Sequence, residues 1–352
     1  PSSSHLLIGG VGSGKTTELL DVQSQLNRIG DTRAFYLDVT RRHDIAKVAV
    51  GVVAIQVHLA LVEALVAEEE AEEEKRVLEN DLNGLRNTAH GYWTDPYHED
   101  DYEHLIHVSG ILVSPDAQIA EQVRHMVELM KPHLTALRAI SPHVVVLIDG
   151  LDRLLDMSAF EQIIEHDIKA LASLGVGVVL VGPLRSLYGI DRTIEQRFDR
   201  THYQPWIDLS SSPNAESFLR EILRKRLPAD VMDDQALIAL VHHSGGVLRD
   251  LIALAQLACL ETYLDGSDLV GLYQADSAID SFGRKHMQGL RSNEIEVLQR
   301  VRTKGTFVQT SEDDLALLMT RRVLEYRVNG RPRYAVHPTI ARFLAEMAGE
   351  QG

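Results

Sequence analysis

The chain has 352 residues, 45% hydrophobic and 24% charged, which is typical of a folded globular protein with two or three domains. Its single cysteine, Cys259, excludes an intrachain disulfide framework and a cysteine-based zinc site, so we expect a reducing, cytoplasmic compartment. The net charge of -16 argues against nucleic-acid binding by the whole surface, and no apolar run reaches the roughly 18 residues of a membrane span.

The first 40 residues predict a strand, a glycine-rich turn, a helix and a second strand. Residues 6–8 are a short apolar strand, residues 16–29 have helical spacing, and residues 34–37 form a strand that ends at Asp38. The chain enters its first strand almost at once and lacks an initiator Met, so we expect that further residues precede Pro1.

A helical and acidic region is predicted next. Residues 45–66 are strongly apolar with helical spacing, and the acidic run at 68–74 is expected to continue that helix on a solvated face. A polar, aromatic stretch follows at 92–102. We interpret about 67–115 as an insertion in the first domain.

The following segments complete an α/β domain. Residues 118–137 predict an amphipathic helix, and the near-continuous apolar runs at 143–148 and 176–181 are typical of strands buried on both faces of a parallel sheet. A last strand is expected at about 203–209. Alternating strands and helices predict a mostly parallel sheet in an α/β domain of residues 1–210.

The rest of the chain changes character twice. Residues 214–279 predict helices only, and we assign residues 211–284 to a helical domain. In residues 285–352, helices at 293–302 and 313–319 precede a strand hairpin around Asn329-Gly330, and a last helix follows Pro338.

The glycine-rich turn carries the most specific motif. Gly-Gly-Val-Gly-Ser-Gly-Lys-Thr at 9–16 matches the P-loop pattern G-x-x-x-x-G-K-[ST] in full, between a strand and a helix. Such a loop curls its N–H groups around phosphate oxygens, Lys15 would reach the β- and γ-phosphates, and the Thr16 hydroxyl would ligate Mg²⁺. We therefore predict ATP with Mg²⁺ as the ligand, bound by Gly9, Gly10, Val11, Gly12, Ser13, Gly14, Lys15, Thr16 and Thr17.

An acidic partner for the P-loop is predicted at the end of the strand 143–148. Asp149 follows this strand directly, and we expect it on the neighbour of the P-loop strand, holding Mg²⁺ directly or through one of its ligands. Asp152 would either polarise the attacking water or cap the next helix, and the sequence leaves both open.

The P-loop together with Ile-Asp-Gly-Leu-Asp-Arg at 148–153 resembles AAA+ and STAND-type ATPases. The segment 243–250, His-Ser-Gly-Gly-Val-Leu-Arg-Asp, is similar to the "sensor 2" segment of origin-recognition-like AAA+ proteins, in which an arginine of a lid helix reaches the γ-phosphate. The resemblance implies that Arg249 is this arginine, that 211–284 form the lid and that 285–352 form a winged helix. It also implies a nucleotide-controlled switch that assembles with itself or with a protein partner.

The chain departs from these families at three places. Gly150 stands where AAA+ enzymes have a glutamate base, the strand 176–181 ends without a polar residue so that Arg185 is the nearest candidate sensor, and no adenine-contacting segment precedes the P-loop. Arg197 or Arg200 would be placed to complete a neighbouring subunit's site. A P-loop kinase-type phosphotransferase and a nucleotide-binding scaffold without hydrolysis remain as alternatives.

A DNA contact, where one exists, is expected in the C-terminal part. Residues 287–352 carry a net charge of +2 against -18 for the remainder. Five arginines gather there, and about three to five usable ones would give a shallow salt dependence, with a log–log slope of about -3 to -4. Winged helices also dock proteins, so DNA and protein both stay open as partners. The five are Arg321, Arg322, Arg327, Arg331 and Arg333.

Overall fold

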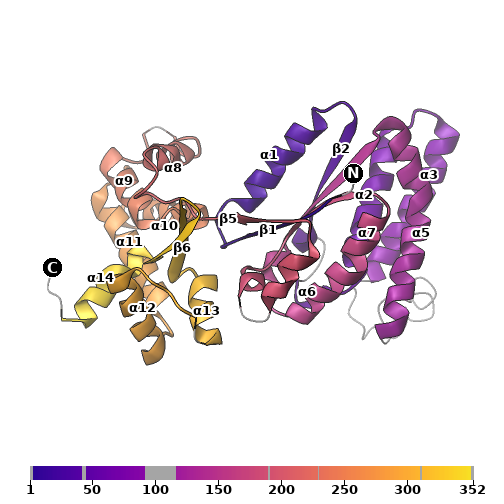
Figure 1. Ribbon diagram of the computed structural model, residues 1–352. Helices are drawn as coiled ribbons and strands as arrows, with labels where there is room; N and C mark the ends of the chain where they lie inside the picture. Colours follow the sequence, from indigo (N-terminus) through magenta and orange to yellow (C-terminus); the bar gives the residue numbers. More distant parts are fainter. Residues whose placement is uncertain are drawn as a thin grey trace, which may run out of the picture. The chain divides into compact units, whose positions relative to one another are not determined.

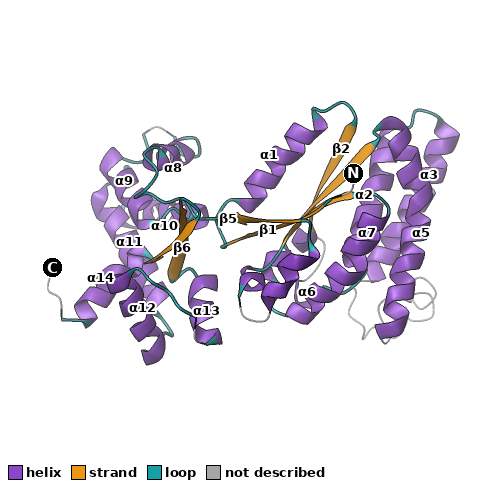
Figure 2. Cartoon of the chain, in the orientation of Figure 1, coloured by secondary structure: helices purple, strands orange, loops and turns teal. Residues whose placement is uncertain are grey.

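The computed structural model describes residues 3–41, 45–91, 116–188, 191–228, 230–309 and 311–349. The chain forms two compact units (Figure 2): unit 1 comprises Pro1–Ile8 and Lys15–His202, and unit 2 comprises Gly9–Gly14 and Tyr203–Gly352. The predicted aromatic stretch at 92–102 lies outside the described residues, as does the last part of the 67–115 insertion. The division into three domains stays a prediction.

Unit 1 contains the predicted α/β sheet, with the strand order β2-β3-β4-β1-β5. The pairs β1–β4, β3–β4 and β2–β3 are parallel, so β1, β2, β3 and β4 end at one edge. β5 ends five residues before the predicted end at 209, because Ile207 instead donates its N–H to the Gly246 carbonyl in unit 2 (3.3 Å). The strands are β1 (Ser4–Gly9), β2 (Thr32–Asp38), β3 (His143–Asp149), β4 (Gly177–Val181) and β5 (Arg200–Gln204).

Helices cover both faces of this sheet. Figure 1 shows α1 on one side and α6 and α7 on the other, and α1 packs against β2 and β3. This arrangement follows from right-handed crossovers, since the chain moves across the sheet in opposite directions before and after β2. The helices of unit 1 are α1 (Lys15–Asn27), α2 (Val52–Glu68), α3 (Glu72–Gly91), α5 (Asp116–Ile140), α6 (Met157–Ile163) and α7 (Lys169–Ser173).

The single helix predicted across residues 45–74 is wrong, because the chain breaks it twice. A short 3₁₀ turn at Ile45–Lys47 is followed by Gly51 with φ 92°, and only then does α2 begin. At the other end, Glu69 has an extended backbone and its carboxylate accepts the Ala71 N–H (3.0 Å), which ends α2 and leads into α3. The acidic residues 70–74 are exposed, as expected.

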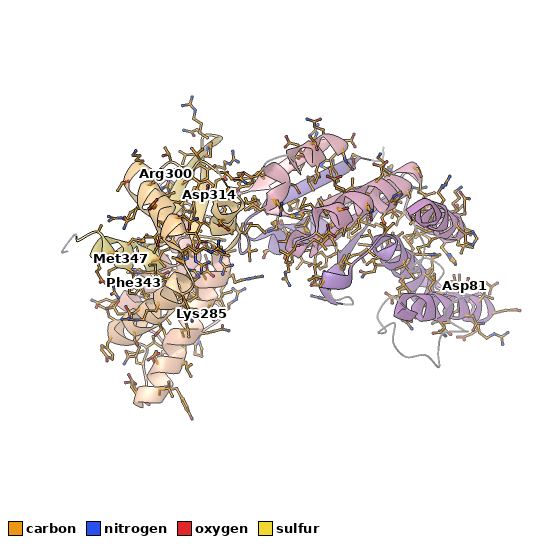
Figure 3. All side chains as sticks on the ribbon, turned by 90° about the horizontal axis from the view of Figure 1, so that it is seen from below. Asp81, Lys285, Arg300, Asp314, Phe343 and Met347 are labelled. Carbon is orange, nitrogen blue, oxygen red and sulfur yellow. The ribbon has the colours of Figure 1, made fainter. Side chains whose placement is uncertain are left out.

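A polar chain joins the three helices α2, α3 and α5. The His58 ring on α2 lies 3.0 Å from that of His133 on α5, and His133 lies 3.2 Å from the carboxylate of Asp81 on α3. Figure 3 labels Asp81. Burial, helped by the neighbouring His133, lowers the pKa of His58 to about 4. His58 is therefore neutral at pH 7, as its apolar surroundings on α2 require.

The buried carboxylate of Asp167 caps α2 from a distant part of the chain. Asp167, in the π-helical turn Ile164–Ile168, accepts the N–H groups of Gly51 and Ala54, each at 2.9 Å, and burial raises its pKa to about 6. We expect Asp167→Ala to lower the free energy of unfolding by about 2–3 kcal/mol, because hydrogen bonds to a charged group are lost and buried donors are left without a partner. Urea unfolding measures this change.

Asp167→Asn is the matched control for this prediction. It keeps one acceptor oxygen for the same amides, so its loss should be clearly smaller than that of Asp167→Ala. Equal stability of Asp167→Ala and the unaltered chain would show that these hydrogen bonds do not stabilise unit 1.

Unit 2 begins with a helical bundle, as predicted for 214–279. Its helices surround a core that includes Leu219, Leu240, Leu254 and Ala278, all fully buried. No helix in the described part of the chain is long and apolar enough to cross a membrane. The bundle comprises α8 (Ala215–Arg224), α9 (Asp234–His243), α10 (Leu248–Asp265) and α11 (Leu272–Met287).

The C-terminal part of unit 2 contains the predicted hairpin. β6 and β7 pair antiparallel, and the turn between them has positive φ at both Asn329 (51°) and Gly330 (77°), the geometry for which an Asn-Gly pair is favoured. The hairpin lies between helices, which is the order that suggested a winged helix. The elements are α12 (Ser292–Lys304), α13 (Glu312–Met319), β6 (Val323–Val328), β7 (Arg331–Val336) and α14 (Pro338–Met347).

Candidate functional site

Asp149 lies at the carboxyl edge of the sheet and accepts three hydrogen bonds. The Thr16 hydroxyl donates to Oδ2 at 2.6 Å, the Tyr36 hydroxyl donates to the same oxygen at 2.9 Å, and the Gly150 N–H donates to Oδ1 at 2.8 Å. The side chain is almost completely buried. Unit 1 thus brings together the P-loop threonine and the strand-end aspartate that the sequence predicted as partners.

The strand that carries Asp149 is not the neighbour of the P-loop strand, which corrects our expectation. β4 lies between β1 and β3. Thr16 still reaches Asp149 because α1 begins above this edge and runs across the sheet to pack on β3 and β2.

Tyr36 is a site residue that the sequence reasoning missed. It lies on β2 two residues before Asp38, so both side chains point to the same face of the strand. Burial and the nearby Asp149 carboxylate raise the pKa of the Tyr36 hydroxyl, which therefore stays protonated and donates to Asp149. The sequence contained one signal for Tyr36, because it is a polar side chain in a largely apolar strand. That strand lies beside β3, which ends in Asp149.

Lys15 is held by Asp152. Its Nζ lies 3.0 Å from the Asp152 Oδ2, and the two side chains are 5% and 13% exposed. The alternative that Asp152 caps the next helix is wrong, because α6 is capped by Asp156, which accepts the N–H groups of Ser158 (2.9 Å) and Ala159 (3.3 Å). Asp152 is instead the anion that balances the P-loop lysine.

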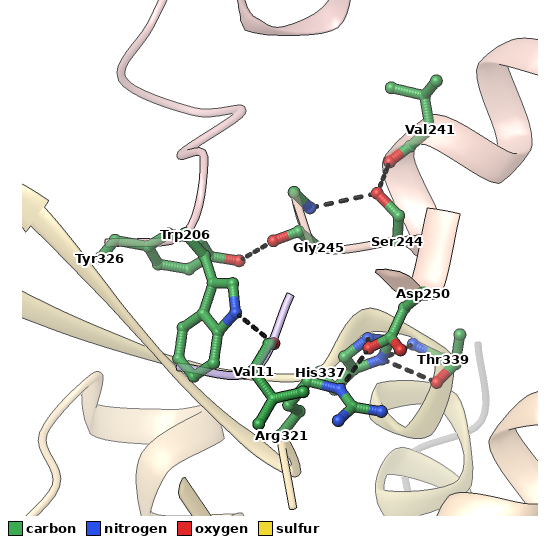
Figure 4. Close-up of polar contacts among 11 residues, drawn as sticks. Val11, Trp206, Val241, Ser244, Gly245, Asp250, Arg321, Tyr326, His337 and Thr339 are labelled. Atoms are coloured by element: carbon green, nitrogen blue, oxygen red, sulfur yellow. Dashed lines mark hydrogen bonds and ion pairs between the residues drawn. The ribbon is translucent and has the colours of Figure 1, made fainter. Parts of the chain in front are cut away.

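The glycine turn of the P-loop, residues 9–14, packs within unit 2. Gly12 and Gly14 have φ of 82° and 98°, which side chains rarely adopt, so the turn depends on glycine at these positions. The Trp206 indole N–H donates to the Val11 carbonyl at 3.1 Å (Figure 4). The Ser13 hydroxyl is buried and has no hydrogen-bond partner among the described residues. An orphaned hydroxyl in a turn of this shape suits a ligand with acceptor oxygens.

The segment predicted as sensor 2 lies at this glycine turn. Helix α10 begins at Leu248, whose N–H donates to the Gly12 carbonyl at 3.0 Å, and a Cβ at Gly12 would lie 3.0 Å from the Cβ of Arg249. The predicted closeness of the Ser-Gly-Gly segment to the P-loop is therefore present within unit 2. The action of Arg249 on a γ-phosphate stays a prediction.

Helix α10 is also tied to the C-terminal hairpin of the same unit. The buried Asp250 carboxylate accepts from Arg321 at 2.8 Å and lies 3.4 Å from His337 (Figure 4). The Tyr326 hydroxyl on β6 donates to the Gly245 carbonyl at 2.7 Å. These contacts fix the start of α10, beside Arg249, to the hairpin.

The arginines predicted as a DNA-contacting cluster are mostly engaged inside unit 2. Arg321 pairs with Asp250, and Arg322 donates to the carbonyls of His286 (2.7 Å) and Gln288 (3.1 Å). Arg327 pairs with Glu325 at 2.5 Å, and Arg333 pairs with Asp208 at 2.6 Å. Of the five, only Arg331 is exposed without such a contact in the described part of the chain. The number of arginines usable for a DNA contact stays a prediction, although four of the five already have partners inside unit 2.

The remaining predicted residues occupy less specific positions. Arg197 pairs with Glu161 (3.2 Å) and Glu165 (3.8 Å), so its charge is balanced within unit 1. Arg200 is exposed at the start of β5, and Arg185 lies half-buried in a 3₁₀ turn after β4. Thr17 is exposed on the first turn of α1.

The donor set at Asp149 fits Mg²⁺. This ion takes oxygen ligands and keeps several waters, so one or two carboxylates and a hydroxyl suffice in a nucleotide site. Thr16 and Asp149 supply such oxygens at one place. Among the described residues no group of three or more His, Cys, Asp or Glu side chains could hold a metal by itself.

Comparison with known proteins gives distant structural likenesses. No protein-family model and no curated protein matches the chain. Among solved structures it is similar to the RuvB Holliday junction branch migration motor of Thermotoga maritima, at 12% identity and a TM-score of 0.43 over 99% of this chain and 88% of that one. It is also similar to ORC1 of Aeropyrum pernix in complex with DNA, at 14% identity and a TM-score of 0.43 over 98% of this chain and 87% of that one. A third similar structure is the FIGL-1 AAA domain in complex with ADP, at 13% identity and a TM-score of 0.42 over 86% of this chain and 78% of that one.

Proposed function

We propose that the chain binds ATP with Mg²⁺ at its P-loop, hydrolyses it slowly, and acts as a switch of the AAA+ or STAND type. The observation that carries the proposal is the hydrogen bond of 2.6 Å between Thr16 and Asp149, which are 133 residues apart in the chain. A hydroxyl and a carboxylate at this spacing, beside the lysine of a complete P-loop, form the arrangement that P-loop NTPases use for Mg²⁺ and phosphate.

Each side chain has a defined part in this proposal. Lys15 would exchange Asp152 for the β- and γ-phosphates of ATP, and its burial strengthens the attraction. Thr16 would turn a lone pair of its hydroxyl oxygen to Mg²⁺ while the hydroxyl still donates its hydrogen bond to Asp149. Ser13 and the N–H groups of the glycine turn would bind phosphate oxygens. Bound Mg²⁺ would neutralise charge on the phosphates.

We expect hydrolysis by the purified chain to be slow. Position 150 has no carboxylate, and general-base assistance is typically worth about 10²–10⁴-fold, so turnover should lie well below the median of about 10 s⁻¹ for enzymes even where a carboxylate elsewhere recovers part of the loss. Phosphate release with excess MgATP measures the rate. Brisk turnover by the monomeric chain would contradict the expectation.

A nucleotide-binding scaffold without hydrolysis is the second candidate, and the pairing of Asp152 with Lys15 favours it. While it pairs with Lys15, the Asp152 carboxylate is not available to a water molecule in place of the missing glutamate. Single-turnover release of the γ-phosphate separates the two functions, because a scaffold releases none even at high protein concentration.

The switch itself would work through helix α10. Arg249 stands in the chain between two residues that make these contacts. Leu248 donates its N–H to the P-loop, and Asp250 pairs with Arg321, which lies just before the hairpin. A change at the glycine turn therefore has a short path to the C-terminal part of unit 2. Because four of its five arginines are engaged internally, we propose a protein partner or a second copy of the chain, rather than DNA, as the ligand of that part.

Mass measurement of the protein in ATP and in ADP tests this partner assignment. Assembly with itself, or with a purified partner, should depend on the nucleotide. Tight binding of duplex DNA that is lost on deletion of 287–352 would restore DNA as the ligand.

A further inference from the structure

The backbone at Gly150 leaves no room for the glutamate that AAA+ enzymes have at this position. Its φ is 96°, a conformation that L-residues rarely adopt. A Cβ at Gly150 would lie 2.8 Å from the Thr40 Cγ2 and 3.0 Å from the Asp38 Oδ1. The space beside Asp149 is therefore already filled by the side chains of Thr40 and Asp38, and the second of these is a carboxylate.

Asp38 reaches this place from the neighbouring strand. It is the last residue of β2 and the register partner of Asp149 on β3, and it shares the strand face of Tyr36, whose hydroxyl donates to Asp149. Oδ1 of Asp38 accepts the Thr40 N–H (3.0 Å) and the Thr40 hydroxyl (2.7 Å). Oδ2 has a long contact of 3.4 Å with Arg41, a side chain that is 76% exposed.

These contacts give the two oxygens of Asp38 different tasks. Thr40 fixes Oδ1 and so orients the carboxylate, while Oδ2 keeps lone pairs for a further donor. The side chain is partly open to solvent, at 21% exposure, so a water molecule reaches it. Asp152, a further carboxylate near this edge, pairs with Lys15 and becomes available only where Lys15 exchanges it for phosphate.

We propose that Asp38 is the catalytic carboxylate that orients and deprotonates the attacking water, an assignment that rests on the proposed ATPase function. The water oxygen forms a bond to the γ-phosphorus, and the bond from that phosphorus to the β-bridging oxygen breaks, with its electron pair leaving on ADP. One water proton passes to Asp38 and from there to solvent, so ADP and inorganic phosphate are the products.

The alternative for Asp38 is purely structural, as the acceptor that holds the turn Val39–Arg41. Asp38→Asn separates the two, because its amide oxygen still accepts from Thr40 while the negative charge and the basicity are lost. Asp31→Asn is the matched control, since it makes the same chemical change on an exposed carboxylate directly before the other end of β2.

The test combines single-turnover hydrolysis with the binding of two Mg²⁺–ADP analogues. ADP–beryllium fluoride imitates bound ATP, whereas ADP–aluminium fluoride imitates the transition state and includes the attacking water. For Asp38→Asn we expect hydrolysis to fall by about 10²–10⁴-fold. Binding of ATP and of the beryllium complex should change little, and the tight binding of the aluminium complex should be lost. Asp31→Asn should keep the activity of the unaltered chain.

Three results would overturn the assignment. Wild-type hydrolysis by Asp38→Asn would show that another group handles the water, and a loss of ATP binding or of folding in Asp38→Asn as large as its loss of hydrolysis would show a structural role. In both cases the unaltered chain still hydrolyses ATP, so the proposed function stands. If the unaltered chain binds no MgATP, or binds it without any hydrolysis, the proposed ATPase function fails, and the role of Asp38 fails with it.

Discussion

Replacing Lys15 by alanine should lower the affinity for MgATP by about 10²–10³-fold while the fold survives. The Lys15 side chain is 5% exposed, and its Nζ pairs with the Asp152 Oδ2 at 3.0 Å. Truncating one member of a buried, hydrogen-bonded charge pair costs roughly 2–5 kcal/mol, and each 1.4 kcal/mol is about tenfold in affinity. Calorimetric titration with MgATP measures the loss, and circular dichroism reports the fold.

Two control variants define what the loss means. Lys131→Ala removes an exposed lysine that pairs with Glu128 in the same unit, and it should leave the affinity unchanged. Asp152→Asn frees Lys15 from its competing anion and should maintain or increase the affinity. Unchanged affinity in Lys15→Ala would show that ATP does not bind at the P-loop.

Replacing Asp149 by asparagine should lower hydrolysis by about 10²-fold or more and should remove the part of ATP binding that depends on Mg²⁺. Groups that orient metal ligands are typically worth about 10–100-fold, and Asp149 in addition carries the charge nearest to Thr16. The amide also presents a donor to the hydroxyls of Thr16 and Tyr36, both of which donate to the carboxylate. ATP titrations with Mg²⁺ and with EDTA measure the difference.

Asp156→Asn is the matched control for this substitution. It makes the same chemical change on the segment that follows β3, but asparagine caps a helix about as well as aspartate. Its hydrolysis and its Mg²⁺ dependence should stay at the unaltered level. Full turnover in Asp149→Asn would mean that the metal is held elsewhere.

Much of the sheet was predictable because its strands β3 and β4 are apolar over almost their whole length. The runs that became β3 and β4 are buried on both faces of the sheet, and such strands have little competing interpretation in the sequence. The two breaks in the helix expected at 45–74 were not predictable, because the helical periodicity of the sequence continues through Gly51 and Glu69. What ends the helix there is backbone conformation and a capping carboxylate from Asp167, which is 116 residues away from Gly51.

The site was predictable to the extent that it is a linear motif. Gly9–Thr16 and Asp149 could be identified because strand and helix positions fix their roles. Tyr36 and the pairing of Asp152 with Lys15 could not, since both depend on which strands are neighbours, and the order β2-β3-β4-β1-β5 is not encoded in any local pattern. The internal pairing of the arginines was not predictable for a related reason, because partners such as Asp208 for Arg333 lie far away in the chain.

The left-handed backbone of Gly150 also limits how this chain can evolve. A glutamate at position 150 would need a different backbone conformation and would meet Thr40 and Asp38 at once, so its first appearance would damage the site that it is meant to improve. A chain with this arrangement can acquire a glutamate directly after Asp149 only once residues 38 and 40 have changed. Those changes would remove the hydrogen bonds that Thr40 now donates to Asp38. Position 150 and the end of β2 should consequently vary together among descendants of the same ancestor.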